Sequence, residues 1–258
     1  AADMARDEPH DDRPQADDRG DVQRYGTIVV VGGGCYGAYY LRQLRRAAKH
    51  FALKFDRIVV VDRDPACAVS REPGADVELC VLEWRDFFAV WLADEASDGD
   101  AIVPSPLMPH LLFQWLEHRA REQWPSRRVE VRTPSPIAGV PWQRVGSDGT
   151  RYVSFAEWTC PVNCIEPRTC PHTRGERTWS LPPSLIAHLQ AARAAGEPLD
   201  GPAIFHCTHR AYGVGMIDVA DVHGASRALS EAAAHGPASL LVGTVSHCHG
   251  ALGVLRVD

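Results

Sequence analysis

The feature that most constrains this chain is a β-branched run that leads directly into a glycine-rich loop. Residues 27–31 read Thr-Ile-Val-Val-Val, and residues 32–37 read Gly-Gly-Gly-Cys-Tyr-Gly. A short apolar run bounded by glycines is typical of a buried parallel strand. Residues 36–50 then carry apolar side chains at helical spacing, and residues 57–62 form a second β-branched run that ends in Asp62. This order predicts a βαβ unit.

The glycines of the loop have the spacing that a bound pyrophosphate requires. Gly32, Gly34 and Gly37 satisfy the pattern G-x-G-x-x-G, in which the first glycine makes the turn, the second admits the phosphates and the third lets the helix pack on the strand. We expect Asp62 to accept hydrogen bonds from ribose hydroxyls, which favours NAD over NADP, although Arg63 beside it is a residue type that serves a 2′-phosphate. The expected cofactor-binding residues are Gly32, Gly34, Cys35, Tyr36, Gly37, Asp62 and Arg63.

Beyond this unit, short apolar runs alternate with stretches of helical periodicity. The expected strands are 77–82, 101–103, 129–131, 202–205 and 239–245, and the expected helices are 87–92, 111–122, 184–195 and 221–235. This alternation predicts an α/β fold with a Rossmann-like, doubly wound, mostly parallel sheet. We expect residues 23–258 to form one sheet-based unit. Residues 1–22 are rich in Asp, Arg and Pro, which predicts a disordered acidic tail.

The segments IVVVGGGCYGAYYLRQL and VVVDRDP resemble the nucleotide-binding domains that regulate potassium conductance, the RCK or Trk-type NAD-binding family. The resemblance covers roughly residues 26–120 and rests on the glycine loop and on the Val-Asp-Arg-Asp-Pro strand end. It implies a Rossmann fold that binds NAD(H) at Gly32, Gly34, Gly37 and Asp62. The Cys- and His-rich segments further along the chain do not belong to that family.

Residues 133–183 form a Pro-rich, irregular insertion that contains Trp and Cys. A stretch of this length without apolar periodicity needs something other than a hydrophobic core to order it. Cys160, Cys164 and Cys170 lie within eleven residues, and the piece Cys-Pro-Val-Asn-Cys-Ile resembles the cluster loops of ferredoxins. Because clustered thiols in a reducing compartment favour metal chemistry over disulfides, we expect an iron–sulfur cluster or zinc here.

Two further groups combine His with Cys directly after a predicted strand. They are His206-Cys207-Thr208-His209 and His247-Cys248-His249. If both strands belong to the glycine-loop sheet, both groups face the nicotinamide end of the dinucleotide. The expected metal ligands are Cys160, Cys164, Cys170, His206 and Cys207, with His172, His209, His247, Cys248 and His249 as other candidates for the fourth ligand. The expected catalytic residues are His206, His209, His247 and His249, because imidazole is the usual acid–base group near neutral pH.

These features predict an NAD(H)-dependent oxidoreductase with a metal centre near the nicotinamide, acting on a small-molecule substrate or with a redox partner protein. The alternatives are a non-enzymatic NAD(H) and redox sensor, or an S-adenosylmethionine-dependent transferase. The formal net charge of -6 and the lack of a basic run argue against a nucleic-acid partner. No apolar run is long enough to span a membrane, and the acidic N-terminal region has no signal-peptide pattern, so we expect a cytoplasmic protein.

Overall fold

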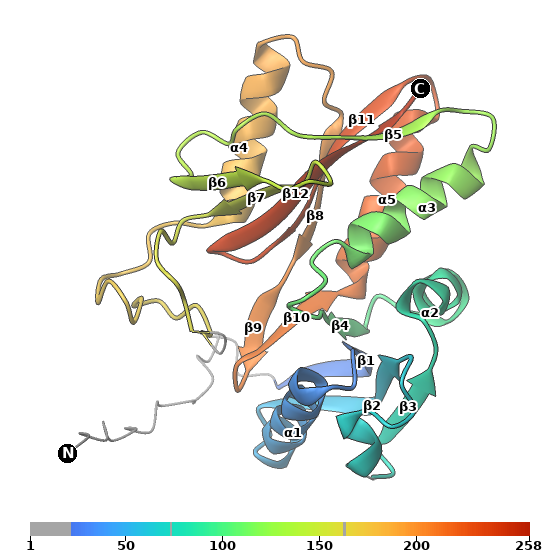
Figure 1. The fold of residues 1–258 in the computed structure, drawn as a ribbon, viewed down its shortest axis with the longest axis vertical. Helices are drawn as coiled ribbons and strands as arrows, with labels where there is room; N and C mark the ends of the chain where they lie inside the picture. The colour runs from blue at the N-terminus through green and yellow to red at the C-terminus, as the bar shows by residue number, and fades with distance from the viewer. Residues whose placement is uncertain (1–21, 73, 162–163) are drawn as a thin grey trace.

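The structure is a computed structural model that describes residues 22–72, 74–161 and 164–258, and it has a mixed α/β fold with two sheets (Figure 1). The predicted acidic tail lies outside the described residues, except for Val22. Within the described ranges, no helix has both the length and the apolar character needed to cross a bilayer.

The first sheet contains the predicted βαβ unit. Its strands are ordered β3-β2-β1-β4-β10-β9. Their bounds are β1 (Gln23–Val31), β2 (Leu53–Asp62), β3 (Val77–Val81), β4 (Ala101–Val103), β9 (Thr208–Ala211) and β10 (Val214–Asp218). The pairs β1–β2, β2–β3 and β1–β4 are parallel, whereas β10 runs antiparallel to both β4 and β9.

Strand β2 accounts for the interval of 28 residues from Gly34 to Asp62, which is longer than the interval of about 20 residues usual in dinucleotide-binding units. It begins at Leu53 and is ten residues long, four residues earlier than the apolar pattern predicted. A tight turn precedes it, in which Phe51 has a φ of 56°. The acid is therefore at the carboxyl end of β2 as predicted, because the added residues extend the start of the strand.

The second sheet is formed by the later part of the chain, and its order is β6-β7-β12-β11-β8, with β5 also paired to β12. Its strands are β5 (Val129–Arg132), β6 (Trp142–Val145), β7 (Arg151–Ser154), β8 (Gly201–His206), β11 (Ala238–Val245) and β12 (His249–Val257). Only β8 and β11 are parallel here. The prediction of a single, mostly parallel sheet was therefore wrong. The strands after α3 pair with one another in a second sheet, except for β9 and β10, which join the first sheet.

All five predicted helices are present, with ends shifted by up to three residues. They are α1 (Cys35–Lys49), α2 (Trp84–Val90), α3 (Leu111–Gln123), α4 (Leu181–Ala194) and α5 (Val219–Ala233), with one π turn (Trp91–Glu95) after α2 and one 3-10 turn (Ala68–Arg71) after β2. Helix α1 covers one face of the first sheet and α4 one face of the second. Helices α2, α3 and α5 share one core with both sheets, which includes Val29, Phe205 and Leu240. The two sheets are therefore packed around common apolar side chains.

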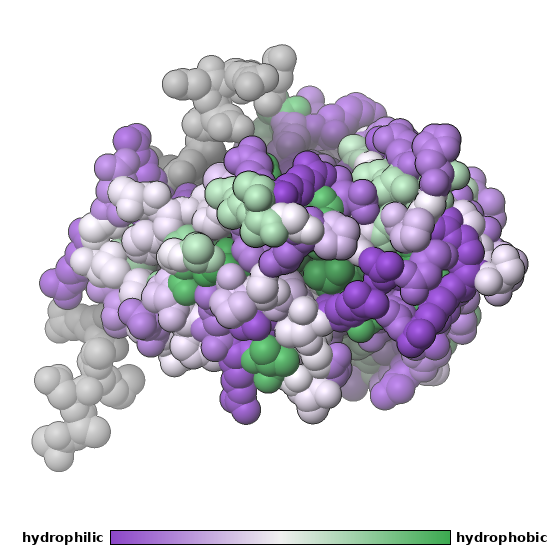
Figure 2. Space-filling model, turned by 90° about the horizontal axis from the view of Figure 1, so that it is seen from above, coloured by the Kyte–Doolittle hydropathy of each residue, from purple (hydrophilic) through white to green (hydrophobic). Residues whose placement is uncertain are grey.

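The outer surface carries few large apolar side chains. The face seen from above is mainly hydrophilic, with hydrophobic residues in small separate patches (Figure 2). Ile186 of α4 is 46% exposed and Trp142 of β6 is 42% exposed. Scattered side chains of this kind are normal on a protein surface and indicate no docking site.

The shared core predicts that the sheets unfold together. Phe205 is fully buried, so Phe205→Ala should lower the free energy of unfolding by about 3–5 kcal/mol in one cooperative transition. Urea unfolding followed by both tryptophan fluorescence and circular dichroism measures this. Ile186→Ala is the control, and its effect should stay within about 0.5 kcal/mol. Two separate transitions, only one of them shifted by Phe205→Ala, would contradict the shared core.

Candidate functional site

The glycine loop has the geometry expected of a turn between strand and helix. Gly32 has a φ of 89°, a value that favours glycine. A Cβ atom on Gly37 would lie 1.9 Å from the Gly32 carbonyl oxygen, so only glycine permits this contact between helix and strand. At Gly34, by contrast, an added Cβ would meet no atom within 4 Å. The loop is thus closed on the protein side and open where a ligand would approach.

Asp62 lies beside this loop and helps to hold it. Its carboxylate accepts hydrogen bonds from the Gly33 N–H at 2.7 Å and from the Asp64 N–H at 2.8 Å. Each carboxylate oxygen keeps a further lone pair that can accept a hydrogen bond from a ligand. Arg63 points away into solvent, 3.7 Å from Glu83, and Cys35 and Tyr36 are exposed in the first turn of α1. The predicted cofactor-binding residues therefore gather at the carboxyl ends of β1 and β2.

A cleft of about 350 Å³ lies at the same edge of the first sheet, between the segments after β3 and β4. It is lined by Glu83, Trp84, Arg85, Asp86, Met108, Leu111 and Gln114. The Trp84 indole N–H donates to the Val61 carbonyl at 2.9 Å, and its ring is 3.7 Å from the position of a Gly32 Cβ. Trp84 was missed in the sequence analysis. Its place directly after a strand end was the available signal.

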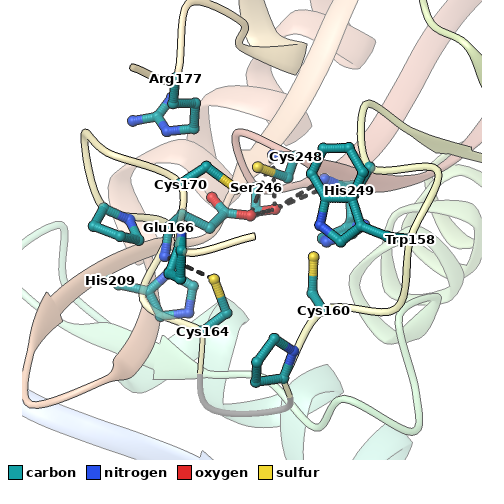
Figure 3. A pocket seen from close by; sticks show the side chains of 14 residues that line it. Trp158, Cys160, Cys164, Glu166, Cys170, Arg177, His209, Ser246, Cys248 and His249 are labelled. Atoms are coloured by element: carbon teal, nitrogen blue, oxygen red, sulfur yellow. Dashed lines mark hydrogen bonds between the residues drawn. The ribbon is translucent and has the colours of Figure 1, made fainter. Parts of the chain in front are cut away.

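A second hollow, of about 200 Å³, brings together the Cys-rich segment and the two His-Cys groups (Figure 3). Its lining includes Cys160, Cys164, Glu166, Cys170, Arg177, His209, Cys248 and His249. Strands β8 and β11 are parallel and in register, with His206 opposite Val245, so their carboxyl ends meet at this edge. The segments therefore meet in one hollow, as the sequence predicted. The hollow lies at the carboxyl ends of β8 and β11 and beside His209 on the edge strand β9, and not at the carboxyl ends of β1 and β2.

Glu166 joins the Cys-rich segment to the turn between β11 and β12. It is only 9% exposed and has a φ of 50°. Its carboxylate accepts hydrogen bonds from the Ser246 hydroxyl at 2.5 Å, the His247 N–H at 2.8 Å and the Cys248 N–H at 3.2 Å. Burial alone would raise the pKa of Glu166, but the Ser246 hydroxyl, nearby His209 and the two N–H groups together lower it. Glu166 therefore acts as an ionised clamp that the sequence analysis did not identify.

The thiols of this hollow differ in their electrostatic surroundings. Burial raises the pKa values of Cys160 and Cys164, and it raises the pKa of Cys248 to about 12. Burial also acts against ionisation of Cys170, but hydrogen bonds from Thr173 and His172 outweigh it and lower the pKa of that thiol. Arg177 lowers the pKa of Cys164 and Cys248 but does not outweigh burial, so most of these sulfurs stay protonated at neutral pH.

The four histidines of the two His-Cys groups are held as neutral imidazoles. Burial lowers the pKa of His206, His209, His247 and His249, and nearby Glu166 offsets this only in part. The His206 and His247 rings are 5.0 Å apart. His249 lies 3.0 Å from the Ser154 hydroxyl, and His247 lies 2.8 Å from the Ser180 hydroxyl. Neutral imidazoles are suited to accept a proton or to bind a metal.

Cys207 occupies a different place from the one predicted for it. Its N–H donates to the Val245 carbonyl at 2.8 Å, and its sulfur lies against Gly215, 2.7 Å from the position of a Cβ there. Burial raises the pKa of its thiol to about 12. Neither Cys207 nor His206 lines the hollow, whereas Cys248 does. Among the residues within the described ranges, no three His, Cys, Asp or Glu side chains converge closely enough to hold a metal ion.

The Glu166 clamp yields a prediction about stability and pH. Glu166→Gln should lower the free energy of unfolding by about 1–3 kcal/mol at neutral pH, because it weakens the hydrogen bonds to the β11–β12 turn. Since folding lowers the pKa of Glu166 below its ordinary value of 4.5, its ionisation stabilises the fold above pH 4.5. The difference from the wild type should therefore narrow as the pH falls below that value.

Urea unfolding from neutral to acidic pH measures this difference, with exposed Glu157→Gln on the same segment as the control. A difference that does not change with pH would show that the charge of Glu166 has no part in the clamp.

Comparison with known proteins gives one family and no function. No curated protein and no solved structure matches the chain. A family model described as "Uncharacterized protein, C-terminal domain", AF_1314_C, matches residues 112–258. The match includes the Cys-rich segment, both His-Cys groups and the whole second sheet, but the glycine loop lies before it. The chain therefore belongs to the AF_1314_C family through its C-terminal part.

Proposed function

We propose that this protein binds NAD(H), with the pyrophosphate on the glycine loop and the adenosine ribose at Asp62. The observation that carries the proposal is the loop itself, where Gly37 is packed against the Gly32 carbonyl while the space at Gly34 is open. The first N–H groups of α1 lack intrahelical partners and carry the positive end of the helix dipole, which is suited to phosphates. The cleft beside Trp84 gives the rest of such a ligand a place to lie.

The arrangement of β1 to β4 supports the same proposal. The order β3-β2-β1-β4 with all pairs parallel is that of the first half of a Rossmann domain, in which ligands bind where the strand order reverses. Helix α1 packs on one face of these strands and α2 on the other. A Rossmann-like unit within the first sheet, as in the RCK-type domains that residues 26–120 resemble, is therefore part of the proposal.

Two substitutions separate binding from folding. Gly34→Ala places a methyl group in open space, so the free protein should keep its stability while NADH binding weakens by at least about tenfold, or 1.4 kcal/mol. Gly37→Ala, in contrast, should destabilise the fold because of the backbone contact at 1.9 Å. Calorimetric titration with NADH, NADPH and S-adenosylmethionine, together with thermal unfolding, measures both effects. Equal NADH affinity in Gly34→Ala and the wild type would exclude the glycine loop as the binding site.

The activity that we favour is that of an NAD(H)-dependent oxidoreductase, and one pair of side chains supports it. His110 follows β4, at the same end of the sheet as the glycine loop, and its Nε2 lies 2.7 Å from the Tyr152 hydroxyl and 3.8 Å from Asp148. Bound NADH would supply a hydride. A hydrogen-bonded phenol and imidazole can then supply the proton that a reduced carbonyl oxygen needs. This pair replaces His206, His209, His247 and His249 as the proposed acid–base groups, because His110 follows β4, which pairs with β1 of the βαβ unit, whereas His209 and His249 line the other hollow.

Turnover tests the activity. The wild type should oxidise NADH with some members of a panel of aldehydes and ketones. Tyr152→Phe and His110→Gln should lower kcat by about 100-fold without changing the affinity for NADH. His118→Gln, at a half-exposed position of α3, is the control. Binding of NADH without turnover of any panel member would instead favour the second candidate, a non-enzymatic dinucleotide sensor.

A further inference from the structure

We propose that Cys160, Cys164, Cys170 and Cys248 hold one metal centre, either a zinc ion or an iron–sulfur cluster. The centre would fasten the segment between β7 and α4 to the turn between β11 and β12. This proposal does not depend on dinucleotide binding, because no residue lines both the thiol hollow and the cleft beside the glycine loop.

The four sulfurs face one hollow. Three of the cysteines come from the segment after β7, and Cys248 comes from a turn that lies about 80 residues later in the sequence, at the carboxyl edge of the second sheet. All four line the same space of about 200 Å³, and their side chains point into it in Figure 3. Four thiolates around one space are the ligand set of structural zinc sites and of iron–sulfur clusters.

The sulfurs accept hydrogen bonds from N–H or O–H groups, including one from the Trp158 indole to Cys160. The Glu166 N–H lies 3.4 Å from the Cys164 sulfur, and the Trp179 indole N–H lies 3.2 Å from the Cys248 sulfur. Cys170 receives hydrogen bonds from Thr173 and His172. Donors of this kind stabilise a metal-bound thiolate and orient it toward the metal. They add little to the stability of a neutral thiol, which is a weak acceptor.

Polar atoms without partners gather around the same hollow. Among the described residues, five buried side-chain nitrogen or oxygen atoms make no hydrogen bond, and two of them are Arg177 Nε and His206 Nε2. Arg177 lines the hollow, and the His206 ring is next to that of His247. Leaving such polar groups buried without a partner is unfavourable. A centre with negatively charged thiolates would provide acceptors for them.

The segment has little regular structure of its own. In its described part, residues 155–161 and 164–180, regular pairing consists of one isolated bridge between Thr169 and Glu176. It is attached to the β11–β12 turn through the Glu166 clamp and near its two ends, where the Phe155 N–H donates to the Cys248 carbonyl and the Trp179 indole N–H to the Cys248 sulfur. Since an unfolded chain has no preformed site, the free energy of metal binding contributes directly to folding. A metal centre would therefore supply the cross-links that apolar side chains do not.

The thiols do not yet converge on a point, since no group of three potential ligands meets the spacing of a bound ion among the described residues. On binding, each of the four thiols would lose its proton to solvent and form one sulfur–metal bond. Rotation of cysteine side chains that already line the hollow would bring this about. A zinc ion would release its bound waters without a change of oxidation state, and a cluster would arrive already assembled, with its own iron and inorganic sulfide, and leave the ligands of its carrier behind.

The identity of the fourth ligand distinguishes this proposal from the ligand set expected from sequence, which included Cys207. The test is metal analysis and visible absorption of full-length protein purified anaerobically from medium that contains both zinc and iron. We expect about one zinc ion or one cluster per chain, and the absorption spectrum tells the two apart. After dialysis against a chelator, Cys248→Ser should retain at least about tenfold less metal than the wild type. Cys207→Ser should retain the same amount.

A second measurement needs no substitution. The wild type, before and after removal of its metal, is treated with iodoacetamide and analysed by mass spectrometry. The half-buried Cys160, Cys164 and Cys170 should be protected only while metal is bound, whereas exposed Cys35 should react in both samples. Less than about a tenth of an equivalent of metal in the wild type would overturn the proposal. So would Cys170 that reacts equally in both samples, or metal loss confined to Cys207→Ser.

Discussion

The hydrogen bond from the Cys207 N–H to the Val245 carbonyl marks the place where the chain passes from one sheet to the other. Up to His206 the chain is β8 and pairs with β11, and from Thr208 it is β9 and pairs with β10. Because the same run of backbone belongs to both sheets, it fixes their relative position. The buried Phe205 just before this point adds an apolar anchor in the core that both sheets share.

The thiol hollow depends on this crossing. Since β8 is in register with β11, the end of the crossing strand lies beside the turn that carries Ser246 and Cys248. That turn presents its N–H groups to Glu166, and a carboxylate with three donors remains ionised despite its burial. The middle of the irregular segment is thus attached by one charged side chain, while its two ends are attached to the same turn by the Phe155 N–H and the Trp179 indole. The cysteines on either side of Glu166 are brought toward Cys248 as a consequence.

The sequence predicted the elements whose conformation depends on neighbouring residues. It did not predict strand pairing, which depends on residues that are far apart in the chain. The run from Thr27 to Gly37 specified its strand, turn and helix, because β-branched residues and glycines restrict the backbone locally. The two sheets were not predictable in the same way, because strands such as β11 and β12 are apolar enough to join either one. Glu166 was not identified either, because its burial depends on a turn 80 residues away.

Helix α1 connects the two candidate sites. It begins at the glycine loop, and three turns would carry it about 16 Å along the first sheet. Near its middle, Tyr40 lies close enough to the Cys207 thiol for that sulfur to contribute to the raised pKa of the phenol, after burial. Farther along, Gln43 donates a hydrogen bond to the Tyr212 carbonyl at 3.1 Å, in the turn of the hairpin β9–β10. Helix α1 therefore contacts the hairpin that carries His209, so the two candidate sites lie on elements that touch although they share no residue.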